Sequence, residues 1–241
     1  MSTQPLALVT GAAHRLGKAF VLALARNGYA ILLHYRSAEM KASKTATEIR
    51  TLGVPVFLSQ ADLTNPKKII SLFAMVDKIP HPLKVLVNSA ATIPVGDPRS
   101  LSVRDWDSAL NLNLRAPFLC SQEAVKRMTD GGLIINVSDI GAQKSWSRYP
   151  SYSVSKAGLE TLTRILARSF APSVRVNAIA PGLVLESELV PPEEWKRLIG
   201  RLPLKRPATV EEIASALEFL LKNEYVTGQT LVIDGGYSLL G

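Results

Sequence analysis

Two side chains with complementary acid–base chemistry lie four residues apart in the segment YPSYSVSKAGLETLTRILA. They are the phenol of Tyr152 and the ammonium of Lys156. Residues spaced by four share one face of a helix, so the two groups are neighbours if this segment is helical. A phenol with a pKa of about 10 is a weak acid–base group at neutral pH, but a nearby ammonium favours its anion and lowers that pKa. The pair is therefore predicted to transfer a proton beside a reducible bond. Tyr149 is a rival, but no lysine follows it four residues later.

A second functional segment, TGAAHRLG at residues 10–17, follows an apolar run and precedes a stretch with helical spacing. Gly11 permits a tight turn after a strand, and Gly17 permits close helix packing while the first helical N–H groups face a pyrophosphate. The segment predicts a dinucleotide site, although two glycines alone are a weak signal. Arg15 stands where such turns often carry a glycine.

The end of the second apolar run indicates which dinucleotide binds. Sites that prefer NAD place an acid there for the ribose 2′-hydroxyl, whereas LLHYRSAE carries Arg36 and Ser37. A guanidinium suits a 2′-phosphate through charge-assisted hydrogen bonds. We therefore predict NADPH as the cofactor, with His14 as a further candidate near the same phosphate. The alternative interpretation of Arg36 is a solvated surface charge.

Apolar runs alternate with stretches of helical spacing along the whole chain. The runs are LALVTG, AILLHY, VPVFLSQ, KVLVNSA, GLIINVSD, VRVNAIAP and QTLVIDGG. They are continuously apolar, as expected for parallel strands covered on both faces. No linker-like or repetitive segment divides them. We predict an α/β fold over residues 1–241: a single-domain, Rossmann-like, doubly wound parallel sheet of about seven strands with helices on both faces.

Polar or special residues follow these runs directly. They are Thr10–Gly11, His34–Arg36, Asp62, Asn88–Ser89, Ser138–Asp139 and Pro181–Gly182. Each alone could be ordinary loop sequence. In a doubly wound sheet, however, ligands bind beyond the carboxyl ends of the strands, so their coincidence predicts one site.

Composition limits the partners. The net charge of +8 favours anionic partners, but the 28 Lys and Arg are scattered, with no basic run interleaved with aromatic residues. We expect a small anionic ligand and no nucleic acid. No apolar run approaches the roughly 20 residues that span a bilayer, and no signal-peptide pattern is visible. The single cysteine, Cys120, suits a reducing compartment. We expect a cytoplasmic protein without a membrane partner, and no metal, because His14, His34 and His81 lack ligand spacing.

The order of these motifs resembles the short-chain dehydrogenase/reductase family over essentially the whole chain. The matching segments are the glycine turn, ADL, NSAA, NLN, YSVSK, APG and the terminal IDGG. The resemblance implies that Asn113, Tyr152 and Lys156 are catalytic, that Lys156 also holds the nicotinamide ribose, and that Asn113 anchors a water in a proton relay. It also places Asp62 near adenine. The full set of expected cofactor residues is Gly11, His14, Arg15, Leu16, Tyr35, Arg36, Ser37, Asp62, Leu63, Asn88, Ala90, Tyr152, Lys156, Pro181 and Gly182.

The family usually has a serine thirteen residues before its tyrosine, and Asp139 occupies that position here. Ser138 lies one residue earlier. Because neighbouring residues of a strand point to opposite faces, only one of the two normally looks into the site. A one-residue adjustment in the following loop would restore Ser138 to the role, so both remain candidates.

Arg15 and Asp139 depart together from the usual family pattern, and in this the chain is similar to pteridine reductases and their dihydromonapterin- and dihydrofolate-reducing relatives. Further shared segments are LHYRSA, PPEEW and DGGYSL. The resemblance implies that Arg15 lies beside both the cofactor phosphate and a pterin. It implies an NADPH-dependent reductase that converts a dihydropterin to a tetrahydropterin, with folates as further candidate substrates.

The predicted chemistry is a proton relay from Asp139 through Tyr152. Reduction of a pterin C=N bond requires a proton on nitrogen, which this relay could bring from solvent. An aspartate beside a phenolate opposes Tyr152 ionisation, so we expect a protonated tyrosine or a raised pKa of the acid. A ketone oxyanion would instead prefer a neutral hydroxyl donor such as serine.

The substrate side shows one mismatch with this subgroup. Pteridine reductases commonly carry a serine and a stacking aromatic residue just after NSA, whereas this chain has Ala91 and Ile93. We predict a substrate-binding loop at 182–207, in which Trp195 shields the substrate or packs with Leu198 on an amphipathic helix. The expected substrate residues are Arg15, Asp139, Tyr152, Ile93 and Trp195.

Two rival functions remain open. One is a carbonyl reductase of the 3-oxoacyl or small-ketone type, favoured by the missing stacking residue and by Ser138. The other is a degenerate family member that binds NADPH as a sensor or scaffold, for which Asp139 is the argument. The intact Asn113, Tyr152 and Lys156 oppose it. The family commonly forms tetramers, so the resemblance implies a homotetramer.

Overall fold

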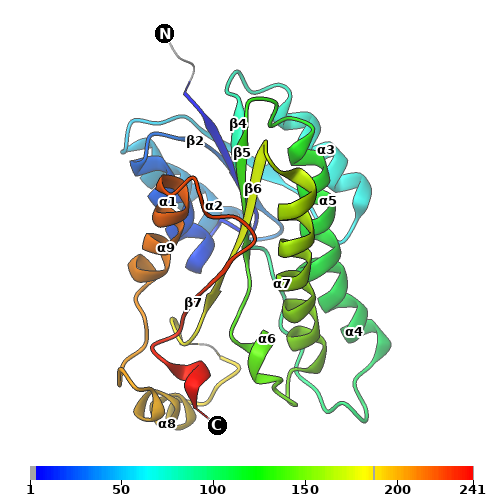
Figure 1. Ribbon diagram of the computed structural model, residues 1–241, viewed down its shortest axis with the longest axis vertical. Helices are drawn as coiled ribbons and strands as arrows, with labels where there is room; N and C mark the ends of the chain where they lie inside the picture. The colour runs from blue at the N-terminus through cyan, green and yellow to red at the C-terminus, as the bar shows by residue number, and fades with distance from the viewer. Residues whose placement is uncertain (1–3, 187, 241) are drawn as a thin grey trace.

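The computed structural model describes residues 4–186 and 188–240. Within them, seven parallel strands form one sheet in the order β3-β2-β1-β4-β5-β6-β7 (Figure 1). The strands are β1 Leu6–Val9, β2 Ala30–Tyr35, β3 Val56–Gln60, β4 Leu83–Asn88, β5 Gly132–Val137, β6 Val174–Pro181 and β7 Thr230–Ile233. Each lies within one of the predicted apolar runs or begins one residue before it. The strand order reverses between β1 and β4, and the predicted doubly wound fold is confirmed.

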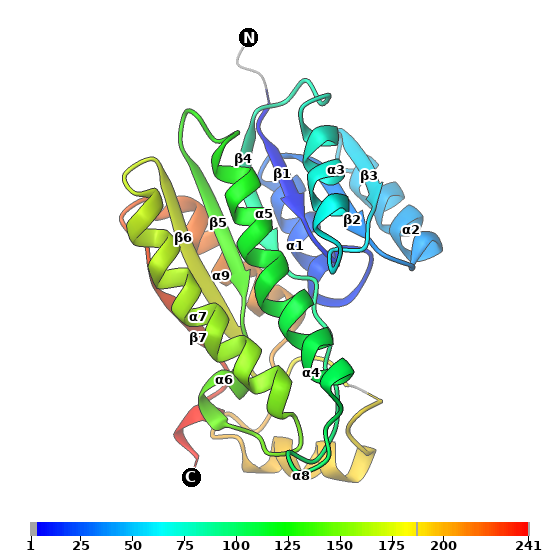
Figure 2. The same ribbon diagram turned by 90° about the vertical axis from the view of Figure 1, so that its right-hand side faces the viewer.

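Helices cover both faces of the sheet. One face carries α1 (Arg15–Arg26), α2 (Glu39–Arg50) and α9 (Val210–Lys222), and the other carries α3 (Pro66–Val76), α5 (Ala116–Val125) and α7 (Pro150–Phe170), as Figures 1 and 2 show. The remaining elements are α4 (Val103–Leu110), the π-helical turn η1 (Asn111–Arg115), α6 (Gly141–Lys144), α8 (Pro192–Arg201) and the 3₁₀ turn η2 (Tyr237–Leu239).

Strand β1 is apolar on every residue because each face of the sheet has its own core. Ala7 and Val9 pack under α1 and α9, while Leu6 and Leu8 pack under the helices of the opposite face. All four are fully buried. Successive side chains of a strand point to opposite faces, so a strand covered on both sides has no face toward solvent.

Helix α1 follows the predicted pattern closely. Phe20 and Leu24 are buried against the sheet. The helix ends at Arg26, two residues before Gly28, whose φ of +83° favours glycine. Cys120, on α5, is fully buried, as free cysteines often are.

The predicted loop 182–207 contains helix α8, and its residue 187 lies outside the described residues. Trp195 is buried in the body of the protein, with 7% of its surface exposed. The predicted amphipathic helix is present, and because Trp195 also lines the cavity described below, its shielding of a substrate stays a prediction. Figure 1 shows α8 at the end of the molecule where the strands terminate, beside the C-terminal segment. Among the described residues no helix is both long and apolar enough to cross a membrane.

Candidate active site

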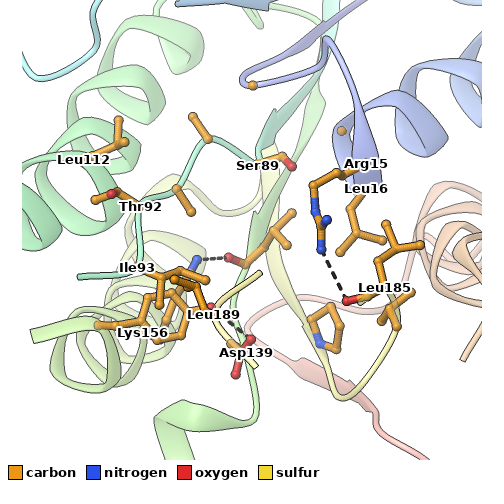
Figure 3. Close-up of a pocket in the computed structure, with 18 of the residues that line it drawn as sticks. Arg15, Leu16, Ser89, Thr92, Ile93, Leu112, Asp139, Lys156, Leu185 and Leu189 are labelled. Atoms are coloured by element: carbon orange, nitrogen blue, oxygen red, sulfur yellow. Dashed lines mark hydrogen bonds between the residues drawn. The ribbon is translucent and has the colours of Figure 1, made fainter. Parts of the chain in front are cut away.

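A cavity of about 810 Å³ opens at the carboxyl ends of the strands (Figure 3). Its wall combines the turn after β1, the segments that follow β2, β4, β5 and β6, and helix α8. The predicted site residues on this wall are Gly11, His14, Arg15, Leu16, Tyr35, Arg36, Ser37, Leu63, Ala90, Ile93, Asp139, Tyr152, Lys156, Pro181, Gly182 and Trp195. Three others, Asp62, Asn88 and Asn113, do not line the cavity.

A carboxylate and a phenol meet at the centre of the cavity. The Tyr152 hydroxyl donates to Oδ2 of Asp139 over 2.9 Å, and the Gly141 N–H donates to Oδ1 over 2.6 Å. Ser138 also lines the cavity, but its buried hydroxyl donates to Oε1 of Glu160 over 2.9 Å. Of the two candidates after β5, Asp139 is therefore the one that is hydrogen-bonded to Tyr152.

Helix α7 presents Lys156 beside Tyr152, one turn along, as their spacing predicts. The Lys156 Nζ donates to the carbonyl oxygen of Val137 over 2.6 Å and lies 5.6 Å from the centre of the Tyr152 ring. Both side chains are almost completely buried. The ammonium is thus held at the junction of α7 and β5, within reach of a ligand in the cavity.

Burial controls the acid–base properties of this group. It raises the pKa of Tyr152 well above 10, and Asp139 raises it further. The expectation that Lys156 lowers the pKa of Tyr152 is therefore wrong: sequence spacing shows the ammonium but not the desolvation of the phenol. Burial also raises the pKa of Asp139, against the Gly141 and Tyr152 hydrogen bonds and the charge of Lys156. The alternative expectation of a protonated tyrosine beside an acid of raised pKa is confirmed in direction.

The same burial lowers the pKa of Lys156 to about 8, while Asp139 opposes the change. The ammonium is still mostly protonated at neutral pH. The site therefore holds one cation, one protonated phenol and one carboxyl group of raised pKa in a shared, water-poor environment.

Asn113 lies behind the cavity wall, in the π-helical turn η1. Its Nδ2 donates to the carbonyl oxygen of Thr92 over 2.9 Å and to Oγ of Ser155 over 3.0 Å. Its Oδ1 accepts from the Thr92 N–H over 2.9 Å. The carboxamide therefore fixes the segment after β4 against α7, and single-turn π-helices often mark such functional positions.

Asn88 and Asp62 also make contacts outside the cavity. Asn88 donates to Oδ1 of Asn136 over 2.9 Å across the sheet. Asp62 accepts from the N–H and hydroxyl of Thr64, and these bonds lower its pKa, with a smaller contribution from Arg36. The two side chains thus order the strand ends that face the predicted cofactor position.

The glycine turn after β1 is packed tightly. Gly11 has a φ of +65°, and a Cβ there would lie 2.8 Å from the Cα of Ala90. A Cβ at Gly17 would lie 2.3 Å from the carbonyl oxygen of Gly11. Both positions therefore need glycine for steric reasons.

Arg15 adopts a glycine-like backbone conformation with a φ of +53°. Its guanidinium crosses the cavity and donates to the carbonyl oxygens of Glu186 over 3.1 Å and Leu185 over 3.3 Å (Figure 3). The side chain therefore connects the cofactor turn with the segment that leads into α8.

Cations gather near the end of β2. Partial burial lowers the pKa of His14, and the charges of Lys41 and Arg15 lower it further. Arg36 is exposed on the same wall. Lys41, in the first turn of α2, does not line the cavity, but it lies close enough to His14 for its charge to act there. The arrangement concentrates positive charge where a phosphate would be favoured.

Aromatic residues form another part of the wall that the sequence did not reveal. Trp146 and Tyr149, after β5, and Tyr237, in η2, line the cavity together with Trp195. The crowding of Trp146 and Tyr149 just before Tyr152 was the available signal. Among residues 4–186 and 188–240, no group of three or more His, Cys, Asp or Glu residues could hold a metal ion.

Comparison with known proteins identifies the class. Residues 11–238 match the family model described as enoyl-(acyl carrier protein) reductase. The chain thus belongs to the short-chain dehydrogenase/reductase family of oxidoreductases, as its motifs predict.

Individual relatives differ in the substrates that their names give. The chain is 33% identical over 246 residues to 1-cyclohexenylcarbonyl-CoA reductase of Streptomyces collinus, covering 98% of this chain and 87% of the relative. It is 31% identical over 237 residues to the 3-oxoacyl-[acyl-carrier-protein] reductase FabG of Staphylococcus aureus, covering 95% and 96%. The structure of FolM alternative dihydrofolate reductase 1 from Brucella suis, in complex with NADP, superposes with a TM-score of 0.93 at 32% identity, covering 99% and 96%.

A buried histidine supports the glycine turn from beneath. Nδ1 of His34 accepts the Gly11 N–H over 3.1 Å, so Nε2 carries the proton and donates to the carbonyl oxygen of Ala61 over 3.0 Å. Burial lowers the pKa of His34 to about 4. The neutral ring is therefore part of the folded structure.

This histidine predicts acid-sensitive stability. Its pKa is about 6.5 in the unfolded chain and about 4 in the folded protein, so the unfolded state binds the proton more tightly. The stability that the neutral ring contributes is present above pH 6.5 and is lost as the pH falls toward 4. We expect about 2 kcal/mol of this loss between pH 7 and pH 5, measured by urea unfolding. His34→Gln should remove that part of the pH dependence, whereas His81→Gln should keep it. An equal pH dependence in wild type and His34→Gln would contradict the assignment.

Proposed function

We propose that this protein is an NADPH-dependent reductase that converts a dihydropterin to a tetrahydropterin, with dihydrofolate as a further candidate substrate. The observation that carries the proposal is the 2.9 Å hydrogen bond between the Tyr152 hydroxyl and Asp139 inside the cavity. A carboxyl group of raised pKa is a proton source, which a C=N reduction needs at nitrogen. The structural likeness to a dihydrofolate reductase supports the same choice.

The residues of the nucleotide end fit NADPH. The first turn of α1 contains no acidic residue, and no side chain caps its N–H groups, so this helix end attracts a phosphate. Arg15 stands beside it. Arg36, Lys41 and His14 would hold the 2′-phosphate, and no acidic residue follows β2 directly to receive a 2′-hydroxyl. When bound, NADPH supplies the hydride for the reduction.

The proton follows a route through two named atoms. Tyr152 Oη gives its proton to the substrate nitrogen, and the protonated form of the Asp139 carboxyl group replaces it from Oδ2 across the same 2.9 Å contact and then takes a new proton from solvent. Lys156 stabilises negative charge that forms on either oxygen during the transfer. A serine in place of Asp139 would donate a hydrogen bond but would hold no spare proton at neutral pH.

The rival carbonyl reductase has one specific observation in its favour. Ile93, an aliphatic residue with 40% of its surface exposed, lines the cavity where a ring would need a flat partner. The names of the Streptomyces and Staphylococcus relatives also point to thioester substrates. The sensor alternative is weaker, because Tyr152, Asp139 and Lys156 are assembled in one place.

We further propose a homotetramer built through two different surfaces. An apolar groove of about 760 Å³ lies between α4, η1, α5 and α7, which lie side by side in Figure 2. Phe118, Val154 and Ile165 line it and are 38%, 48% and 55% exposed. A second apolar area surrounds the edge strand β7, where Phe219 and Val232 are exposed. Two-fold contacts through both surfaces would close a tetramer.

We propose a cytoplasmic location, which the single buried thiol of Cys120 supports.

The cofactor assignment predicts a loss of NADPH binding without an equal loss of NADH binding. Arg36→Ala combined with Lys41→Ala should raise the KM for NADPH by roughly 10–100-fold, the value of one or two charge-assisted hydrogen bonds. The KM for NADH should change much less. Arg50→Ala, at the far end of α2, removes a charge outside the cavity and serves as the control. An equal rise for both cofactors would argue against a 2′-phosphate site.

The substrate assignment is tested by NADPH oxidation with dihydrobiopterin, dihydromonapterin, dihydrofolate and an acetoacetyl thioester. We expect turnover with the pterins. Asp139→Asn keeps a polar side chain but no acid, so pterin turnover should fall by roughly 10²–10⁴-fold. In the wild type the pterin rate should fall as the pH rises through the Asp139 pKa, and this dependence should disappear in the variant. Asp139→Ser should lower pterin turnover and raise any ketone turnover. Reaction with the thioester alone would establish the carbonyl reductase instead.

The assembly predicts separable interface variants. Ile165→Glu should halve the mass of the tetramer, because a charge placed in the apolar groove loses its hydration on association. Phe219→Glu should also give dimers through loss of the other surface, and the double variant should give monomers. Light scattering after size-exclusion chromatography measures each mass. Ile70→Glu, at an exposed residue of α3, is the control. Unchanged masses in both single variants would exclude this arrangement.

A further inference from the structure

Three aromatic side chains gather on the substrate side of the cavity, next to the catalytic carboxylate. The ring of Trp146 lies 6.1 Å from that of Tyr149, edge to face, and 6.4 Å from that of Tyr237 at a tilt of 38°. All three line the cavity. Trp146 is the member common to both contacts, and it remains partly exposed.

The backbone around Trp146 makes room for the indole beside Asp139. A Cβ at Gly141 would lie 2.9 Å from two atoms of the six-membered ring of Trp146 and 3.0 Å from Oδ1 of Asp139. The indole therefore lies against the same glycine whose N–H donates to that carboxylate. Ser145, directly before Trp146, has a φ of +50°, a strained conformation for a residue with a side chain.

The outer aromatic residues are restrained by cations. The Arg148 guanidinium lies 5.9 Å from the centre of the Tyr149 ring, and the Lys144 Nζ lies 5.8 Å from that of Tyr237. The Lys144 Nζ also donates to the carbonyl oxygen of Leu240, near the C-terminus. These contacts hold Tyr149 and Tyr237 in place, and these two support the indole.

We propose that Trp146 is the surface against which a planar heteroaromatic substrate stacks, and that it sets the preference for such a ring over an aliphatic carbonyl compound. The inference rests on the proposed function and names the residue that selects the substrate. Ile93 is aliphatic, and Trp195, although it also lines the cavity, exposes only 7% of its surface. Trp146 combines a flat face, partial exposure and a position beside Asp139, so a ring stacked on it lies next to the proton donor.

The first test compares two replacements of this side chain. Trp146→Leu keeps an apolar wall but removes the flat face, and it should raise the KM for dihydrobiopterin roughly ten-fold, as expected for loss of one stacking contact. Trp146→Phe keeps a smaller face and should recover most of that loss. The rise in KM should exceed the fall in kcat, because Trp146 donates no proton. Trp106→Phe, on α4 and outside the cavity, is the control. Equal KM values in wild type and Trp146→Leu would overturn the proposal.

A binding measurement separates this inference from the proposed function. Biopterin should quench the tryptophan fluorescence of the wild type and of Trp106→Phe in the presence of NADP⁺, and the quenching should be largely lost in Trp146→Phe. Quenching through Trp146 without pterin turnover would keep the stacking surface and reject the pterin reductase. Pterin turnover with the same quenching in Trp146→Phe as in wild type would keep the reductase and reject the stacking surface.

Discussion

The Tyr152 hydroxyl and the Asp139 carboxylate meet between α7 and the end of β5, 2.9 Å apart, with the tyrosine buried and the aspartate half-buried. Asp139 makes Tyr152 harder to ionise, whereas the hydrogen bond from Tyr152 favours the ionised form of Asp139, and burial raises the pKa of both groups. A buried carboxylate is tolerated only where donors and a cation compensate for its lost hydration. The Gly141 N–H, the tyrosine hydroxyl and the nearby Lys156 supply them. A neutral hydroxyl would need none of this support, which is why the proposed function gives the Asp139 proton a role.

Arg15, at the glycine turn, also carries an energetic cost, in its case backbone strain. Its left-handed backbone conformation disfavours any residue with a Cβ by about 1 kcal/mol, and glycine would remove the strain. The guanidinium compensates by two hydrogen bonds to the segment before α8. The turn that faces the cofactor and the segment that faces the substrate are therefore connected by one side chain. This explains why a long cation occupies a glycine position.

Much of this arrangement could be predicted from the sequence, because it depends on local pattern. The apolar runs predict the strands. Parallel strands bring their carboxyl ends to one edge of the sheet, where Gly11, Arg36 and Asp139 line the same cavity. Other features depend on contacts between distant segments. The Ser138 hydroxyl is bound by Glu160, which leaves Asp139 as the partner of Tyr152. The Asn88 side chain lies outside the cavity wall because it donates to Asn136. The raised pKa of Tyr152 depends on its burial, which residue spacing does not reveal.

The order of the functional groups along the cavity favours a planar ring over an extended thioester as the proposed substrate. Arg36 and Lys41 stand at the nucleotide end, the Tyr152–Asp139 pair stands at the centre, and Trp146 stands on the substrate side of that pair. Reduction of a keto group also takes up one proton, but its oxyanion is served by a neutral hydroxyl donor, and an aliphatic chain makes no use of a flat wall. A ring with a C=N bond would use the Asp139–Tyr152 pair at its nitrogen and the indole at its face. Asp139 and Trp146 share the Gly141 backbone that positions them, so the proton source and the stacking surface would act on the same bound ring.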